Sequence, residues 1–309
     1  GAATDPDVLA IKMTVYRTGT DSVLMESLIA AARAGKEVTV VVELMARFDE
    51  EANISWANRL EDAGAHVVFG VFGYKVHAKM LLLVRREEGR LKRYVHLGTG
   101  NYHPRTARLY TDFGLLTANE EIASDVNDLF VQITGLGHAG ELKHLYQSPF
   151  TLNNMLMSAI DREIQHAQEG RPAHIIAKMN ALLEPQVISA LYRASQAGVK
   201  IQLIIRGVCA LRPGVEGLSE NITVRSIVGR FLEHTRVFYF LNDKAENLFI
   251  ASADWMGRNL FRRIETCVPI LDAKLKRRVI KEGLKIYLED NANTWDMQPD
   301  GSYRRRVAR

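Results

Sequence analysis

The hydrophobic residues of this chain follow two periods in turn. Short runs of aliphatic and β-branched residues at positions 11–16, 38–44 and 66–69 predict buried strands. Apolar positions spaced by three or four residues at 21–34 and 50–63 predict the helices that connect them. Strand and helix therefore alternate, which is typical of an α/β domain with a largely parallel sheet.

The same order begins again in the second half of the chain. Glycines and a proline after a predicted helix at 122–134 indicate a boundary, so we expect domains at residues 1–144 and 145–309. The second domain has a predicted helix at 185–197 and predicted strands at 175–179, 200–205 and 223–227. This repetition indicates that one α/β unit is duplicated.

Residues 73–84 place polar side chains inside an otherwise apolar strand. In one continuous strand Lys75, His77 and Lys79 would share a face, because successive side chains alternate. Two ammonium groups lower the pKa of a neighbouring imidazole, which keeps it neutral and nucleophilic, and they attract phosphate. The alternative is a structural histidine bonded to a backbone carbonyl. The His-x-Lys spacing and its repeat downstream favour the reactive histidine.

Residues 231–240 repeat this segment, with His234 and Arg236 in the places of His77 and Lys79. The strand that follows each segment ends in a loop of small residues closed by a polar residue, which is Asn101 in the first half and Asp254 in the second. Asn101 is expected to contact phosphate, whereas an ionised Asp254 would repel it. This asymmetry predicts His77 as the nucleophile and His234 as its helper.

A carboxylate lies eleven positions beyond each of these loop residues, at Asp112 and at Glu265. A carboxylate can accept a hydrogen bond from one ring N–H of a histidine and so fix its tautomer. Our hypothesis is that the carboxylates pair with the histidines across the two halves, one for each.

Composition adds little to this interpretation. The net charge of +4 reflects 40 Lys and Arg against 36 Asp and Glu, which favours polyanionic partners weakly. Cys209 and Cys267 form no Cys-x-x-Cys pair, which excludes a disulfide framework and indicates a reducing cytosol. No apolar run reaches membrane-spanning length. The chain begins abruptly at Gly1, close to the first predicted strand, so we expect an excised fragment.

Two further groups of residues have plain interpretations. His96 and His103 have no carboxylate or cysteine at ligand spacing, so we expect them to be structural and not metal ligands. The arginines at 304–306 are expected to belong to a frayed terminus, with contact to a polyanion as the alternative.

A duplicated α/β unit with His-x-Lys or His-x-Arg, followed by a small-residue loop, is similar to the phospholipase D superfamily. The resemblance implies two tandem phospholipase D-like α/β domains, each a mostly parallel mixed sheet flanked by helices. It also implies a shared site in which one imidazole attacks phosphorus and the other acts as acid or base. The aspartate expected a few residues after the lysine is absent, because Val84 and Leu241 stand there. This departure argues against an ordinary phosphodiesterase.

Motifs along the whole chain resemble the first class of polyphosphate kinase, as its two C-terminal domains without its N-terminal and head domains. The matching segments are MTVYRTG (13–19), ELMARFD (43–49), VHAK (76–79), GTGNY (98–102), LYTD (109–112), IIRG (204–207) and EHTR (233–236). The resemblance implies ATP-dependent, reversible extension of inorganic polyphosphate through a phosphohistidine at His77.

The resemblance also implies ligand contacts. The implied nucleotide contacts are Tyr110, Arg206 and His234, and the implied magnesium and phosphate region is at Arg17 and Arg47. From their charge and position we also expect Lys79 and Asn101 to bind the nucleotide phosphates. Arginine is not a ligand for a hard cation, so we interpret Arg17 and Arg47 as holding the phosphates that hold Mg²⁺. Both arginines, like Arg206, follow predicted strands, at the end where open α/β sheets bind ligands.

The expected partners are ATP or ADP and inorganic polyphosphate, with no specific nucleic acid. The polyanion is expected in a basic groove lined by Arg17, Arg47, Lys75, Lys79, Arg206 and Arg236. We expect the full-length protein to be a homo-oligomer in the cytoplasm, with peripheral membrane association as an alternative. Two other functions stay open: a phosphodiesterase or nuclease on the same scaffold, and a non-catalytic polyanion-binding module.

Overall fold

The computed structural model describes residues 1–138 and 140–307, and the chain folds into two compact units. Unit 1 contains Gly1–Leu109, Phe113–Leu145 and Arg262–Thr266, and unit 2 contains Tyr110–Asp112, Tyr146–Phe261 and Cys267–Arg309. Two short segments are therefore exchanged, because each belongs to one unit while the chain on both sides of it builds the other. The main passage from unit 1 to unit 2 falls after Leu145.

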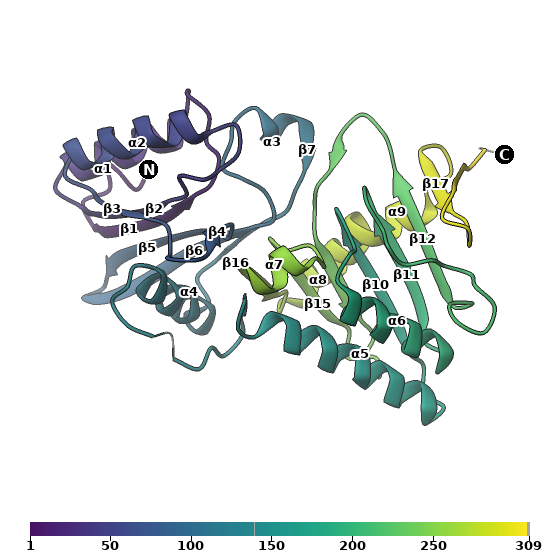
Figure 1. The fold of residues 1–309 in the computed structure, drawn as a ribbon. Coiled ribbons are helices and arrows are strands. Elements are labelled where there is room, and N and C mark those ends of the chain that lie inside the picture. The colour runs from purple at the N-terminus through teal and green to yellow at the C-terminus, as the bar shows by residue number, and fades with distance from the viewer. Residues whose placement is uncertain (139, 308–309) are drawn as a thin grey trace. The chain divides into compact units, whose positions relative to one another are not determined.

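Unit 1 is built on a six-stranded mixed sheet with helices on both faces. Its elements are β1 (Val8–Val15), α1 (Val23–Arg33), β2 (Glu37–Val42), α2 (Glu50–Asp62), β3 (His66–Phe69), β4 (Lys75–Val76), β5 (Lys79–Glu87), β6 (Arg90–Gly98), α3 (Thr106–Leu109), β8 (Gly114–Thr117) and α4 (Glu120–Ile133). The strand order is β3-β2-β1-β5-β6-β8. Figure 1 shows α1 and α2 on one face of this sheet and α4 on the other.

Local sequence explains where these elements begin and turn. Helix α1 starts after Ser22, whose Oγ accepts the backbone N–H of Met25 at 3.2 Å. The strands β5 and β6 are joined at Glu88 and Gly89, which have positive φ angles of 50° and 76°. Positive φ at both central residues gives the two-residue hairpin turn that matches the twist of the strands.

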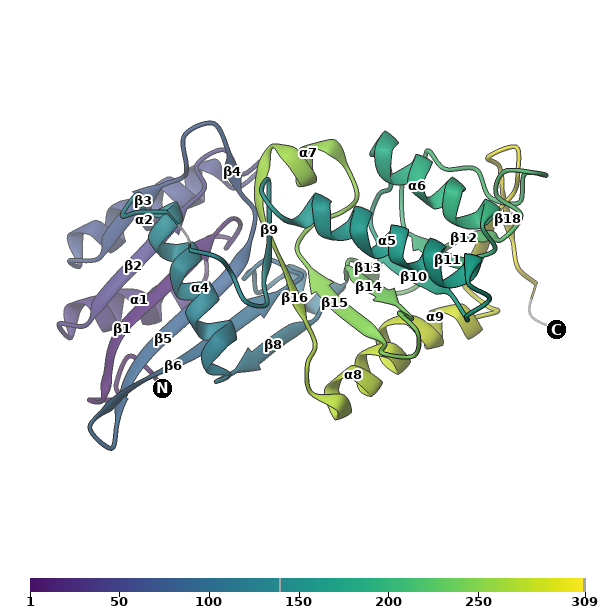
Figure 2. The same cartoon turned by 90° about the horizontal axis from the view of Figure 1, so that it is seen from below.

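Unit 2 repeats the plan with additions at its edge. Its elements are β7 (Tyr110–Thr111), β9 (Tyr146–Ser148), α5 (Leu152–Gln168), β10 (His174–Met179), α6 (Pro185–Gln196), β11 (Lys200–Ile205), β12 (Ile222–Ile227), β13 (Leu232–Glu233), β14 (Val237–Phe240), β15 (Asn247–Ala251), α7 (Gly257–Phe261), β16 (Arg263–Pro269, its first four residues in unit 1), α8 (Ala273–Ile280), a π-helix (Lys281–Lys285), α9 (Ile286–Glu289), β17 (Thr294–Met297) and β18 (Tyr303–Arg305). The strand order is β18-β17-β12-β11-β10-β14-β15-β16. Figures 1 and 2 show α5 and α6 on one face of the sheet and α8 and α9 on the other.

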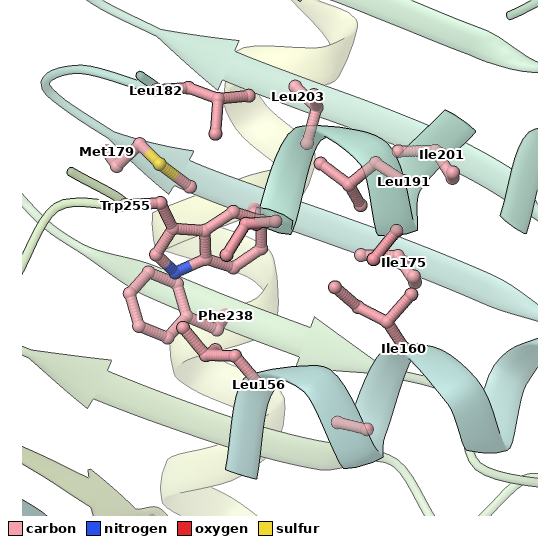
Figure 3. Packing of buried hydrophobic residues seen from close by; sticks show 14 of the residues in the cluster. Leu156, Ile160, Ile175, Met179, Leu182, Leu191, Ile201, Leu203, Phe238 and Trp255 are labelled. Atoms are coloured by element: carbon pink, nitrogen blue, oxygen red, sulfur yellow. The ribbon is translucent and has the colours of Figure 1, made fainter. Parts of the chain in front are cut away.

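The core of unit 2 lies between its sheet and the helices α5 and α6. Figure 3 shows Trp255 against Phe238, with Leu156 of α5 beside them, and the two aromatic ring centroids are 5.1 Å apart. All three side chains are fully buried. Burial of large apolar side chains is the main favourable contribution to folding, so this cluster stabilises the unit that carries the second histidine.

The fold corrects three expectations. The parallel part of each sheet is limited to three strands, β3-β2-β1 and β12-β11-β10, because the strands that follow return through short connections and pair antiparallel. The segment at residues 73–84 is not one strand, because β4 ends at Val76 and β5 begins at Lys79. The frayed terminus is also wrong for residues 303–306, because β18 pairs with β17 and the Arg306 guanidinium contacts both carboxylate oxygens of Asp296 at 2.9 Å.

Among the described residues, no helix combines the length and the apolar character needed to cross a membrane.

Candidate functional site

In unit 1, His77 lies at the break between β4 and β5. The backbone N–H groups of His77 and Ala78 both donate to the carbonyl oxygen of Ile264, at 2.9 and 3.0 Å. Ile264 belongs to the exchanged segment Arg262–Thr266, whose Ile264 also pairs with Val76 of β4. The break therefore satisfies two backbone donors with one acceptor and takes the histidine out of the regular alternation of the strand.

The next residue of the exchanged segment, Glu265, holds the imidazole. The Nδ1 atom of His77 lies 2.8 and 2.9 Å from the two carboxylate oxygens of Glu265, whose side chain is fully buried. Because a carboxylate accepts hydrogen bonds, it favours the tautomer of His77 with the proton on Nδ1. The lone pair on Nε2 is then available for attack or for proton acceptance.

The two lysines near His77 donate hydrogen bonds from their ammonium groups to backbone carbonyl oxygens. The ammonium of Lys79 donates to the carbonyl oxygen of His77 and lies 5.4 Å from the centre of the Tyr16 ring. The ammonium of Lys75 donates to the carbonyl oxygen of Met45 at 3.1 Å. The expected row of three side chains on one face is therefore wrong, since the strand that would align them is interrupted. Tyr16 meets the imidazole edge-on, with ring centroids 4.8 Å apart.

In unit 2, His234 has the same kind of partner from the other exchanged segment. Its Nδ1 atom lies 2.8 Å from a carboxylate oxygen of Asp112. The Arg236 guanidinium reaches the carbonyl oxygen of His234 at 3.2 Å, as Lys79 reaches that of His77, and lies 3.1 Å from Nε2 of the ring. The structure thus places one carboxylate on each histidine, and each comes from the other half of the chain. The ring of Tyr110 lies 5.2 Å from that of His234.

Arg236 also neutralises Asp254. The guanidinium contacts both carboxylate oxygens of Asp254 at 3.2 Å, and one of these oxygens accepts the N–H of Asn180 at 2.6 Å. Burial alone raises the pKa of Asp254, but the charge and hydrogen bonds of Arg236 outweigh it and hold the pKa below its ordinary value. The expectation that Asp254 repels phosphate is corrected, because the buried pair carries no net charge.

The predicted arginines of unit 1 lie together beyond the ends of β1 and β2. The Nε atom of Arg17 donates to the carbonyl oxygen of Arg47 at 3.0 Å. Phe48 has a positive φ of 76°. The centre of its ring lies 4.9 Å from the guanidinium carbon of Arg47 and 6.0 Å from that of Arg17. Two guanidinium groups at one edge of the sheet form a site suited to phosphate oxygens.

Of the remaining predicted residues, Arg206 lies beside the His234 segment of unit 2, and Asn101, His96 and His103 lie in unit 1. Arg206 follows β11 in unit 2 and donates to the carbonyl oxygen of Glu233 at 3.2 Å, and burial lowers the pKa of its guanidinium. Asn101 lies in unit 1, and its Oδ1 atom is buried with no hydrogen-bond partner among the described residues. His96 bonds the Tyr102 hydroxyl at 2.8 Å, and the ring of His103 accepts two backbone N–H groups, so the structural interpretation of both histidines agrees with their contacts.

Magnesium is the cofactor that the resemblance implies. Within residues 1–138 and 140–307, no group of three or more His, Cys, Asp and Glu side chains is placed to hold a metal ion. Arg17 and Arg47 offer no lone pair to a hard cation. These side chains therefore do not fit a magnesium ion held by the protein itself.

Sequence reasoning missed two buried charged residues. Glu43 accepts the backbone N–H of Met45 at 3.0 Å and that of Val76 at 2.8 Å, so it ties the Arg47 loop to the strand that precedes His77. Lys178 lies within β10 and contacts Glu233, the residue before His234. A charged residue in or directly after an apolar run is the signal that could have found both.

The comparisons with known proteins show the family of the chain. The family model for polyphosphate kinase C-terminal domain 1 matches residues 1–139, and that for C-terminal domain 2 matches residues 145–309. The polyphosphate kinase of Neisseria meningitidis serogroup A is 67% identical over 302 residues, which are 98% of this chain and 44% of that protein. The enzyme of Burkholderia ambifaria is 66% identical over 311 residues, 99% of this chain and 45% of that protein. The chain therefore spans a little under half the length of these relatives.

The comparison with solved structures points to the same family. The crystal structure of polyphosphate kinase from Porphyromonas gingivalis matches with a TM-score of 0.91 and 39% identity, over 99% of this chain and 47% of that one. Phosphatidylserine synthase from Haemophilus influenzae shares the fold alone, with a TM-score of 0.61 and 11% identity over 97% of this chain and 83% of that one. The predicted class of two tandem α/β domains, each a mixed sheet flanked by helices, is confirmed. The chain belongs to the polyphosphate kinase family and corresponds to its two C-terminal domains.

Proposed function

We propose that this chain carries the phosphotransfer centre of a polyphosphate kinase, which moves the γ-phosphate of ATP reversibly to inorganic polyphosphate through a phosphohistidine at His77. The observation that supports it most directly is the contact of His77 Nδ1 with both oxygens of the buried Glu265. A neutral imidazole held in this way presents Nε2 as a nucleophile at neutral pH.

The reaction divides into two displacements at phosphorus. In the first, the Nε2 lone pair of His77 forms a bond to the γ-phosphorus, and the bond from that phosphorus to the bridging oxygen breaks, so that ADP leaves with the electron pair. In the second, a terminal oxygen of polyphosphate attacks the same phosphorus, and the imidazole leaves with its electron pair. Positive charge builds on the ring in the first displacement, and the Glu265 carboxylate beside Nδ1 stabilises it.

The other site residues take supporting roles in this proposal. His234, held by Asp112, is the second imidazole and serves as acid or base. Tyr110 and Arg206 bind the nucleotide, whereas Lys79, Asn101, Arg17 and Arg47 bind phosphate oxygens. Magnesium enters as an ion bound to the nucleotide phosphates, which Arg17 and Arg47 hold. Homo-oligomerisation and a cytoplasmic location stay predictions.

The test is covalent labelling. The chain, alone and within a full-length polyphosphate kinase that carries it, is incubated with γ-labelled ATP. We expect an acid-labile, base-stable label that is lost in His77→Ala and kept in His138→Ala, which changes an exposed histidine of the same unit. Equal labelling of wild type and His77→Ala would overturn the proposal. Hydrolysis of a generic phosphodiester would favour a phosphodiesterase, and salt-sensitive polyphosphate binding without any label would favour a binding module.

A further inference from the structure

Lys178 of unit 2 is a buried cation next to the second histidine. Only 1% of its surface is exposed, and its ammonium donates to the Thr235 hydroxyl at 2.6 Å. It also lies 3.2 Å from a carboxylate oxygen of Glu233 and 4.9 Å from the centre of the Tyr287 ring. A buried ammonium is costly unless it is paired, so these contacts account for its retention in the fold.

Glu233 connects Lys178 to the exchanged segment Tyr110–Asp112. The carboxylate oxygen that faces Lys178 also accepts a hydrogen bond from the Thr111 hydroxyl at 2.8 Å. Thr111 belongs to β7, which pairs with β13 through only Leu232 with Tyr110 and Glu233 with Thr111. A ladder of two residue pairs is marginal by itself, so the polar contacts supply much of the anchoring of β7.

The residue that follows this anchor is Asp112, the partner of His234. Its carboxylate lies 2.8 Å from Nδ1 of His234, and the backbone N–H of His234 donates to the Thr111 hydroxyl at 3.2 Å. The same hydroxyl is therefore acceptor for the histidine backbone and donor to Glu233. Lys178, Glu233 and Thr111 form one continuous set of hydrogen bonds that ends at the histidine.

In the described residues of the first half, an uncharged contact takes the place of the Lys178–Glu233 ion pair. Leu81 and Phe238, each four residues beyond its histidine, pair with Met13 and Ala177. Thr14 and Lys178 consequently occupy equivalent positions in the two repeats. The Thr14 hydroxyl donates to the carbonyl oxygen of Ala78 at 2.6 Å, so an uncharged contact stands where unit 2 has an ion pair.

The residue directly before each histidine also differs between the two halves of the chain. The equivalent of Glu233 in the first half is Val76, which directly precedes His77. The ion pair is therefore particular to the histidine that we do not assign as the nucleophile.

We propose that Lys178 is a positioning residue for the second histidine: through Glu233 and Thr111 it fixes β7 so that Asp112 holds His234 with its proton on Nδ1. Burial lowers the pKa of Lys178, and the charge and hydrogen bond of Glu233 oppose that shift. The effect on catalysis rests on the proposed function, whereas the effect on the tautomer of His234 does not.

The primary readout is the tautomer of His234, measured by long-range ¹H–¹⁵N correlation spectra of the chain, with the His234 signals assigned from a His234→Gln sample. We expect the Nδ1–H tautomer in wild type and a mixture with the Nε2–H tautomer in Lys178→Met and in Glu233→Gln. His77 should keep its Nδ1–H tautomer in both. Lys200→Met, which changes an exposed lysine of the neighbouring strand β11, is the matched control and should change neither histidine.

A second pair of variants covers a failure of Lys178→Met to fold. Thr111→Val removes the hydroxyl that joins Glu233 to the histidine backbone, and Thr111→Ser keeps it. The proposal requires loss of the His234 tautomer in the first and its retention in the second. It is overturned if folded Lys178→Met keeps the wild-type tautomer, or if the two Thr111 variants give the same spectrum.

Activity is measured in parallel in the full-length enzyme. Loss of a group that orients a functional histidine costs about 10- to 100-fold in activity in comparable sites, so we expect kcat of Lys178→Met to fall by about that factor with little change in KM for ATP. Absence of any label on wild-type His77 would remove the proposed function but leave the tautomer measurement unaffected. A lower kcat with an unchanged tautomer would show that Lys178 acts by some other route and would overturn the positioning role.

Discussion

Replacing Glu265 by Gln removes one negative charge from beside His77 while keeping the size of the side chain. Glu265 is fully buried, and both of its carboxylate oxygens lie within 2.9 Å of Nδ1 of His77, so water does not screen the interaction. An amide can also turn its NH₂ group toward Nδ1, which would move the ring proton to Nε2 and remove the nucleophilic lone pair. Both effects slow the attack of His77 on phosphorus.

The size of the effect follows from the charge that develops on the ring. Two opposite unit charges about 4 Å apart attract each other by about 4 kcal/mol at an effective dielectric constant of about 20. Since each 1.4 kcal/mol or so corresponds to a factor of ten in rate, the loss predicts a decrease of about 10³-fold in the rate of His77 phosphorylation.

The assay is single-turnover labelling with γ-labelled ATP in a full-length polyphosphate kinase that carries this chain. Glu121→Gln is the matched control, because Glu121 of α4 also contacts a histidine, His144 at 2.6 Å, but is half exposed. We expect the control to label at the wild-type rate. A folded Glu265→Gln variant that labels within about threefold of wild type would refute the electrostatic role of this carboxylate.

Two further predictions concern stability. Trp255→Ala should lower the free energy of unfolding by about 3–5 kcal/mol, measured by urea denaturation, because Trp255 is fully buried against Phe238, and a loss under about 1 kcal/mol would contradict this packing. Asp254→Asn should cost about 3–5 kcal/mol at pH 7, because it leaves Arg236 buried without its counter-charge. Since the folded-state pKa of Asp254 lies below its ordinary value of 3.8, the ion pair contributes fully above pH 3.8, and its contribution is lost as the pH falls through the folded-state pKa. The difference between wild type and Asp254→Asn should therefore shrink in acid, and a difference that does not change with pH would count against this assignment.

The elements of the fold could be predicted where a pattern is complete within a short window. The strands at residues 66–69 and 200–205 are examples, because burial selects residue types locally. Helix α5, Leu152–Gln168, is absent from the expected elements although it packs on the unit 2 core. The break at His77 could not be predicted, since it is made by the carbonyl oxygen of Ile264, a residue far along the chain.

The chemistry of the site was only partly readable. The equal spacing from Asn101 to Asp112 and from Asp254 to Glu265 marked two carboxylates, but it is also compatible with pairing inside each half. The exchanged segments Tyr110–Asp112 and Arg262–Thr266 decide the pairing, because they hydrogen-bond to β13 and β4. No local sequence pattern indicates which distant strand pairs with a segment of only two residues.

The sequence by itself determined most of the alternation of strands and helices, the duplication, and the histidines and carboxylates of the candidate site. These properties depend on the burial and charge of each residue, and the residue type at a single position indicates both. The tertiary structure alone decided that Lys79 and Arg236 hold the backbone of their own histidines, that Asp254 is neutralised, and that Lys178 reaches β7 through Glu233. A hydrogen bond forms only when the donor and the acceptor lie within about 3 Å of each other. Each of these contacts therefore depends on the register between segments distant in sequence, or on the conformation of a side chain.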